Sequence, residues 1–173
     1  MIRILMIFFL LGISQAKYQA VETLDLNSYI GEWYEVYENN FDKTFQNGKC
    51  VKAFYKLNDN NVSVLNTQIK DNKLDNITGF AYYKDDNSGG YLTVKLDDLP
   101  EAPYWIIELG PIVNNLYDYA IVSDNIRLSL FVLARNVSNF FELYNDNVLD
   151  SLHDLGFSNK INSPILVDQN NCP

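Results

Sequence analysis

Short apolar segments alternate with clusters of Asn, Asp, Gly and Ser through the middle of the chain, from about residue 50 to 135. Segments of this kind, rich in Val, Ile, Leu, Phe and Tyr and bounded by turn-forming residues, are typical of β-strands that follow one another in a meander. A similar segment starts earlier, at Gly31. We therefore predict eight strands, at residues 31–37, 50–57, 61–69, 76–83, 91–96, 104–109, 117–123 and 128–135.

Apolar and polar residues alternate within several of these strands, which gives their side chains a direction. In the second strand Val51, Ala53 and Tyr55 share one face, and Lys52 and Lys56 point the other way. Eight antiparallel strands in sequence order favour an all-β fold, an up-and-down barrel, because closure removes exposed sheet edges and can enclose one small ligand. The apolar faces would then line the interior.

The residues on these apolar faces are the candidate wall of a binding cavity. Small pockets bind chiefly through apolar area, while a few polar groups orient the ligand. Tyr55 and Asn66 are the candidates for that polar role. The alternative is that the same side chains fill a collapsed core. The candidate ligand-binding residues are Tyr55, Val64, Asn66, Ala81, Val94, Leu96 and Phe131.

The pattern changes after the last predicted strand. Val148, Leu149, Leu152 and Leu155 recur at helical spacing, with Asn145 or Asp146 as candidate N-cap and Gly156 directly after. This spacing predicts one amphipathic C-terminal α-helix. We expect its leucine face to pack on the outside of the sheet.

The N-terminal residues 1–16 have the pattern of a secretory signal peptide. Arg3 supplies one positive charge, an apolar run extends over residues 4–13, and the small residues Ser14 and Ala16 follow. This run is too short for a transmembrane helix, which needs roughly 20 residues, although a retained membrane anchor is the alternative. Cleavage after Ala16 would leave residues 17–173, beginning at Lys17, as one secreted, extracellular domain.

Two further features depend on this export route. The chain has two cysteines, Cys50 and Cys172, and an oxidising compartment favours a disulfide between them over two free thiols. Three Asn-x-Ser/Thr triplets begin at Asn61, Asn76 and Asn136 and are compatible with N-glycosylation in a eukaryotic host.

Charge and residue types narrow the classes of function. The chain has 13 Lys and Arg against 22 Asp and Glu, a net charge of −9. Such a surface repels phosphates, which argues against nucleic acid and anionic lipid as partners and favours a soluble monomer. His153 is the only histidine and lies on the predicted outer helix, and both cysteines have each other as partner. We therefore predict no catalytic residue, metal site or cofactor.

Several motifs resemble those of the lipocalin family. Gly31-Glu-Trp33 resembles the first family motif, Gly-x-Trp, and residues 130–136 resemble the last-strand motif that ends in an arginine, here Arg135. Their separation suits an eight-stranded barrel. Residues 48–50, 65–66, 102–106, 119–122 and 167–173 resemble the apolipoprotein D-like branch of that family, so the likeness spans nearly all of residues 17–173.

The resemblance implies an eight-stranded antiparallel up-and-down barrel with one α-helix outside. It implies that Gly31, Trp33 and Arg135 close the barrel floor, with the guanidinium across the indole face in a cation–π contact. It also implies a carrier that performs no chemistry on a small hydrophobic ligand of the fatty acid, retinoid, bilin or steroid class. The alternative is a barrel that acts through its loops on a receptor or another protein.

The chain departs from the family pattern at two places. Residues 114–116, Asn-Asn-Leu, stand where the family usually has Thr-Asp-Tyr, which weakens any inference about receptor contacts there. The second disulfide common in apolipoprotein D-like proteins has no cysteines here, whereas Cys50 and Cys172 match the bridge from an early strand to the C-terminus.

Overall fold

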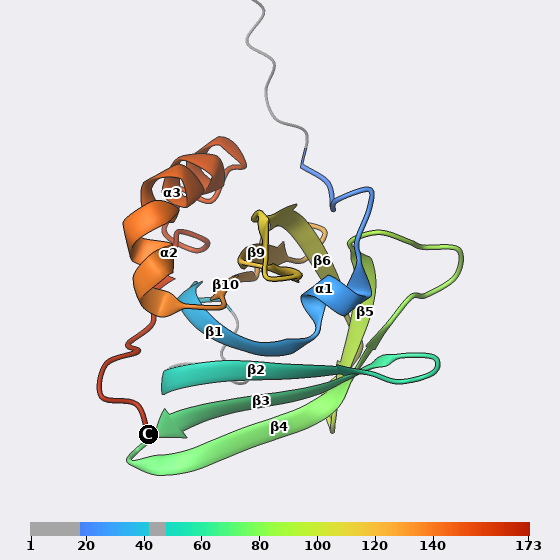
Figure 1. Cartoon of the computed structure of the whole chain (residues 1–173), viewed down its shortest axis with the longest axis horizontal. Helices are drawn as coiled ribbons and strands as arrows, with labels where there is room; N and C mark the ends of the chain where they lie inside the picture. The colour runs from blue at the N-terminus through green and yellow to red at the C-terminus, as the bar shows by residue number, and fades with distance from the viewer. Residues whose placement is uncertain (1–17, 42–47) are drawn as a thin grey trace, which may run out of the picture.

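A computed structural model describes residues 18–41 and 48–173. The predicted leader and the expected N-terminus at Lys17 lie outside these residues. Figure 1 shows a curved antiparallel sheet with helices beside it. Because β10 pairs with β1 as well as with β9, the sheet closes into a barrel. Its eight strands are β1 (Gly31–Glu38), β2 (Lys49–Leu57), β3 (Val62–Lys70), β4 (Lys73–Tyr82), β5 (Tyr91–Leu96), β6 (Ala102–Leu109), β9 (Tyr119–Ser123) and β10 (Leu130–Ala134).

The predicted barrel is confirmed, and its strands lie within a few residues of the predicted ones. The exception is the stretch 117–123, which is two strands. Between β6 and β9 the chain forms a hairpin of β7 (Ile112–Val113) and β8 (Leu116–Tyr117). Asn114 and Asn115 form its turn with φ of 51° and 65°. Asparagine tolerates this left-handed conformation, which a two-residue hairpin turn requires.

The C-terminal part contains more regular structure than the sequence predicts. One helix was expected, whereas α2 (Val137–Leu143) and α3 (Asn145–Asp154) follow each other directly. The cap expected at Asn145 or Asp146 is wrong: Tyr144 precedes α3 and its side chain makes no capping hydrogen bond. The reason is that the N–H of Tyr144 still donates to Phe140 in α2, so α3 continues an existing helix. Asn136 caps α2, its Oδ1 accepting from the N–H of Asn139 at 3.0 Å.

The outward position of the helices is confirmed. Figure 1 shows α2 and α3 together on one side of the barrel. Phe140, Val148 and Leu152 are buried there against Ile121 and Val132, which face outward from β9 and β10. The barrel interior forms a separate apolar cluster around Trp33. The molecule therefore has one core inside the barrel and a second between barrel and helices.

The C-terminal tail is tied to the first two strands. Strand β11 (Ile165–Leu166) pairs with the end of β1, an element that the sequence did not predict. Gln169 Nε2 then donates to the carbonyls of Glu35 and Val51, each at 2.8 Å. The predicted disulfide between Cys50 and Cys172 is confirmed, with the two Cα atoms 5.5 Å apart.

Candidate ligand-binding cavity

The barrel encloses a cavity of about 240 Å³. All seven predicted wall residues line it, and they come from β2, β3, β4, β5 and β10. The strand register explains why they meet: Tyr55 lies opposite Val64, and Ala81 lies opposite Val94. Directly opposed residues in an antiparallel pair point to the same face, so each of these pairs covers one patch of the wall.

Other wall residues extend this surface. Ala53, Val62, Leu92 and Leu133 continue the alternation of the predicted strands, so the periodicity could have identified them. The short helix α1 (Leu26–Tyr29) also contributes, through Leu26 and Tyr29. Its helical turn is too short to produce a periodic signal, and sequence reasoning missed it for that reason. Further lining residues are Glu35, Val51, Lys52, Leu99, Pro100, Ala102, Pro103, Tyr104, Val122, Ser123 and Ser129.

Arg135 and Trp33 close one end of the barrel. Trp33 is completely buried, and Arg135 Cζ lies 3.6 Å from its ring centroid. The guanidinium donates to the carbonyls of Tyr29 at 3.0 Å, Ile30 at 2.8 Å and Glu32 at 2.5 Å. Burial lowers the pKa of Arg135 to about 10, so the group remains charged at neutral pH. This cation therefore joins β10 to α1 and β1 across the floor.

Gly31 fits this floor for two reasons. Its φ is +101°, a conformation that side chains rarely adopt, and an added Cβ would lie 3.3 Å from Arg135 Nη1. A side chain at this position would be strained by the φ angle and would press on the guanidinium, so glycine suits the close approach of β1 to Arg135.

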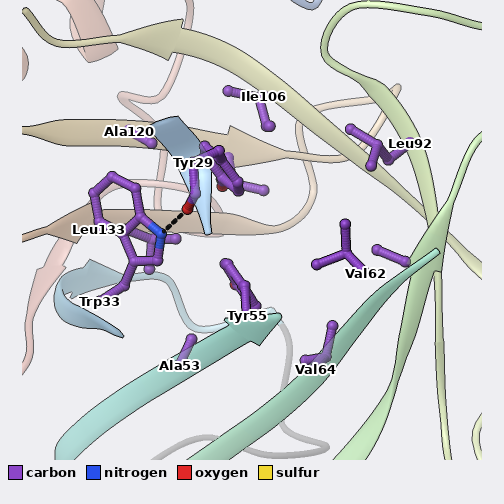
Figure 2. Close-up of a cluster of buried hydrophobic side chains, with 12 residues drawn as sticks. Tyr29, Trp33, Ala53, Tyr55, Val62, Val64, Leu92, Ile106, Ala120 and Leu133 are labelled. Carbon is purple, nitrogen blue, oxygen red and sulfur yellow. Dashed lines mark hydrogen bonds between the residues drawn. The ribbon is translucent and has the colours of Figure 1, made fainter. Parts of the chain in front are cut away.

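Three tyrosine hydroxyls form a chain inside the cavity near this floor. Tyr104 OH lies 2.8 Å from Tyr29 OH and 3.0 Å from Tyr55 OH. Figure 2 shows Tyr29 between Trp33 and Tyr55, with the indole N–H donating to the Tyr29 carbonyl at 2.8 Å. Burial raises the pKa of all three phenols, so they stay neutral. The two hydrogen bonds between them use two of the three O–H donors.

The opposite end of the barrel is the mouth. Because the strands are antiparallel, the connections at residues 97–101 and 124–129 lie at the end away from Arg135. Leu99, Pro100 and Ser129 on these connections line the cavity. The three tyrosines therefore lie at the end of the cavity away from these two connections.

The remaining candidate chemistry lies elsewhere. His153 is exposed on α3, outside the barrel, with Nδ1 3.6 Å from an oxygen of Asp154. Within residues 18–41 and 48–173 there is no group of three or more His, Cys, Asp or Glu residues that could hold a metal ion. No helix in this part of the chain is long and apolar enough to cross a membrane.

Comparisons with known proteins agree with this architecture. The family model described as a lipocalin-like domain matches residues 24–162. Apolipoprotein D from Cavia porcellus is 32% identical over 165 residues, which cover 88% of this chain and 80% of the relative. Temperature-induced lipocalin-1 from Arabidopsis thaliana is 31% identical over 137 residues, covering 73% and 70%.

Solved structures show the same fold at lower identity. Apocrustacyanin C1 superposes with a TM-score of 0.67 at 20% identity, covering 88% of this chain and 84% of the other. Insecticyanin from the tobacco hornworm Manduca sexta gives a TM-score of 0.65 at 19% identity, covering 90% and 86%. From the family match and the sequence relatives together, the chain belongs to the lipocalin family, in its apolipoprotein D-like branch.

Proposed function

We propose that this lipocalin is a secreted, monomeric carrier that holds a small hydrophobic molecule inside the barrel and performs no chemistry on it. One observation carries the proposal: the interior contains a cavity of about 240 Å³ with a predominantly apolar wall, instead of a filled core. An apolar pocket with few polar groups is the usual form of a small-molecule site. The leader pattern at residues 1–16 and the single domain proposed for residues 17–173 are parts of the same proposal, as is glycosylation at Asn61, Asn76 and Asn136.

The size of the cavity limits the ligand. Its volume lies somewhat below the roughly 300–1,000 Å³ of typical ligand pockets. We therefore expect a compact lipophile, or a longer one whose end projects through the mouth. Burial of about 300 Å² of apolar ligand surface would contribute about 7 kcal/mol. A dissociation constant on the order of 10 µM follows.

Fluorescence quenching tests this carrier function. Decan-1-ol should displace a fluorescent lipophilic probe, and a retinoid should quench the tryptophan fluorescence directly. Both signals should saturate near one ligand per protein. Phe131→Asp should abolish binding, because Phe131 lines the cavity and an uncompensated buried charge is costly. Phe80→Asp is the matched control: Phe80 is 42% exposed and pairs with Lys95 on β5, so the same change there should leave binding intact.

A folding check and a second cavity variant complete the test. Far-UV circular dichroism checks that the Phe131 variant folds, and Ala81→Met offers a second variant that fills the cavity without adding charge. Unchanged affinity in both cavity variants would refute binding inside the barrel. Native mass spectrometry of the secreted protein should find a bound lipophile, whereas a consistently empty barrel would favour the role in protein interaction.

A further inference from the structure

The C-terminal tail is inserted between β1 and β2 at one side of the barrel. The pairing of these two strands covers the first half of β1. Further along, the N–H of Val167 donates to the Val36 carbonyl at 3.0 Å, and the N–H of Cys50 donates to the Asp168 carbonyl at 2.8 Å. Figure 1 shows the tail passing the ends of both strands. The tail therefore takes the place in which the ladder between β1 and β2 would otherwise continue.

Gln169 joins the two strands through one nitrogen atom. Its Nε2 donates to the carbonyls of Glu35 on β1 and Val51 on β2, each at 2.8 Å. An amide NH2 group has two polar hydrogens, so one nitrogen can serve two acceptors. The two carbonyls cannot bond to each other, because both are acceptors. The side chain of Gln169 therefore supplies a link between the strands that their own carbonyls cannot make.

The two residues that Gln169 links belong to the cavity wall. Glu35 and Val51 are both buried, and both line the cavity. The pKa of Tyr55 is raised first by burial and further by the Glu35 carboxylate, so this charge lies within electrostatic reach of the tyrosine chain. A shift of the backbone at these two positions would therefore change both the shape of the cavity and the charge beside its tyrosines.

We propose that Gln169 is a positioning residue of the ligand-binding cavity: its carboxamide joins β1 to β2 through the backbone of Glu35 and Val51 and holds this part of the wall in the shape that a ligand requires. This inference rests on the proposed carrier function. It adds to the site a residue that is not among the described residues lining the cavity.

Anchors on both sides of Gln169 hold the tail independently of this side chain. The N–H of Val167 bonds to β1, and the disulfide ties Cys172 to Cys50 on β2. Loss of the amide alone should therefore leave the tail in place. Each of these anchors reaches one strand, whereas Gln169 bonds to both strands at a single atom. Its substitution tests that link separately from the attachment of the tail.

A fixed wall favours binding for an entropic reason. Groups that become ordered only when the ligand arrives reduce the affinity, and a site already held in its bound shape avoids this loss. Without the amide, the backbone at Glu35 and Val51 loses one link between the strands, so the ligand has to order the wall itself. Gln169 therefore acts on affinity without contacting the ligand.

Calorimetric titration with decan-1-ol, at a low temperature at which the variants are folded by circular dichroism, tests the proposal. Gln169→Met keeps the length of the side chain and removes both donors, so we expect the dissociation constant to rise about fivefold. Gln169→Glu sets carboxylate oxygens against the two carbonyls and should weaken binding at least as much. Gln169→Asn keeps the donors on a shorter side chain and should give an intermediate constant, and it is the milder variant if the other two fail to fold.

Two variants are the matched controls. Asn170→Ala removes the neighbouring carboxamide, whose Nδ2 bonds to Asp168 within the tail at 3.0 Å, and should bind decan-1-ol as the wild type does. Leu152→Ala lowers stability from a fully buried position under α3, outside the barrel. Its dissociation constant should stay within about twofold of the wild type, because a change in stability alone does not alter the affinity of the folded protein.

The outcomes separate this role from the carrier function. Wild-type affinity in the folded Gln169 variants would overturn the positioning role and leave the carrier function standing. An equal loss of affinity in Asn170→Ala or Leu152→Ala would also overturn it, since the effect would then come from the tail in general or from stability. A wild type that binds neither decan-1-ol nor a retinoid would refute the carrier function for these classes of molecule, and the inference with it.

Discussion

The floor of the barrel gives the sharpest stability prediction, through Arg135→Ala. The variant loses a guanidinium 3.6 Å from the buried Trp33 ring, a desolvated cation–π contact of about 2 kcal/mol. It also removes donors from the floor carbonyls. The Tyr29 carbonyl keeps the Trp33 indole N–H as a partner, whereas the Ile30 carbonyl, 2.8 Å from Nη2, loses its side-chain donor. The Ile30 hydrogen bond is part-buried, and a carbonyl left without a partner away from water costs about 1–3 kcal/mol.

Together these losses should lower the free energy of unfolding by about 3–5 kcal/mol. For a protein of this length, this corresponds to a decrease in Tm of roughly 6–20 °C. Urea unfolding of the oxidised protein, followed by tryptophan fluorescence and circular dichroism, measures the change. Arg135→Lys should recover only part of the loss, because an ammonium lacks the planar face and the fork of donors.

Arg127→Ala is the matched control for this prediction. Arg127 also lies over an aromatic ring, with Cζ 4.2 Å from the centroid of Tyr18, but it is exposed and its side chain makes no hydrogen bond within the described residues. Its loss should cost under about 1 kcal/mol. If Arg135→Ala unfolds at the same urea concentration as the wild type or as Arg127→Ala, the floor-closing role of Arg135 is wrong.

Three further predictions concern other parts of the structure. Cys172→Ser opens a bridge between residues 122 positions apart and should cost about 4–5 kcal/mol in urea unfolding; a loss below about 1 kcal/mol would contradict a stabilising disulfide. Leu152→Ala, at a fully buried position under α3, should cost about 2–5 kcal/mol, clearly more than Leu155→Ala at a half-buried position, and equal losses would show that α3 packs differently. Burial raises the pKa of Tyr29 and Tyr104 in the folded state, so above pH 10 the unfolded chain loses these protons first and binds fewer of them; the free energy of unfolding should therefore fall as pH rises from about 10. Tyrosinate absorbance from these two residues should develop only as the protein unfolds, and its appearance in the folded protein would contradict the prediction.

The sequence by itself determined the strands and the direction of their side chains. Alternation is a local property: once a segment is a strand, every second side chain points to the same face. For this reason Val64, Asn66, Val94 and Phe131 could be assigned to one cavity wall before any contact between strands was known. The disulfide could also be predicted from the sequence, because the chain has only two cysteines.

Only the tertiary structure decided which groups those walls enclose. Tyr29 reaches the cavity from a helix of four residues, and β11 pairs with β1 across more than a hundred residues of chain. That Asn66 Oδ1 is buried without a hydrogen-bond partner in the described part of the chain is also invisible in the sequence, because it depends on the apolar neighbours that the register places beside it. These features follow from barrel closure, which brings distant segments together, and local periodicity carries no information about which segments will meet.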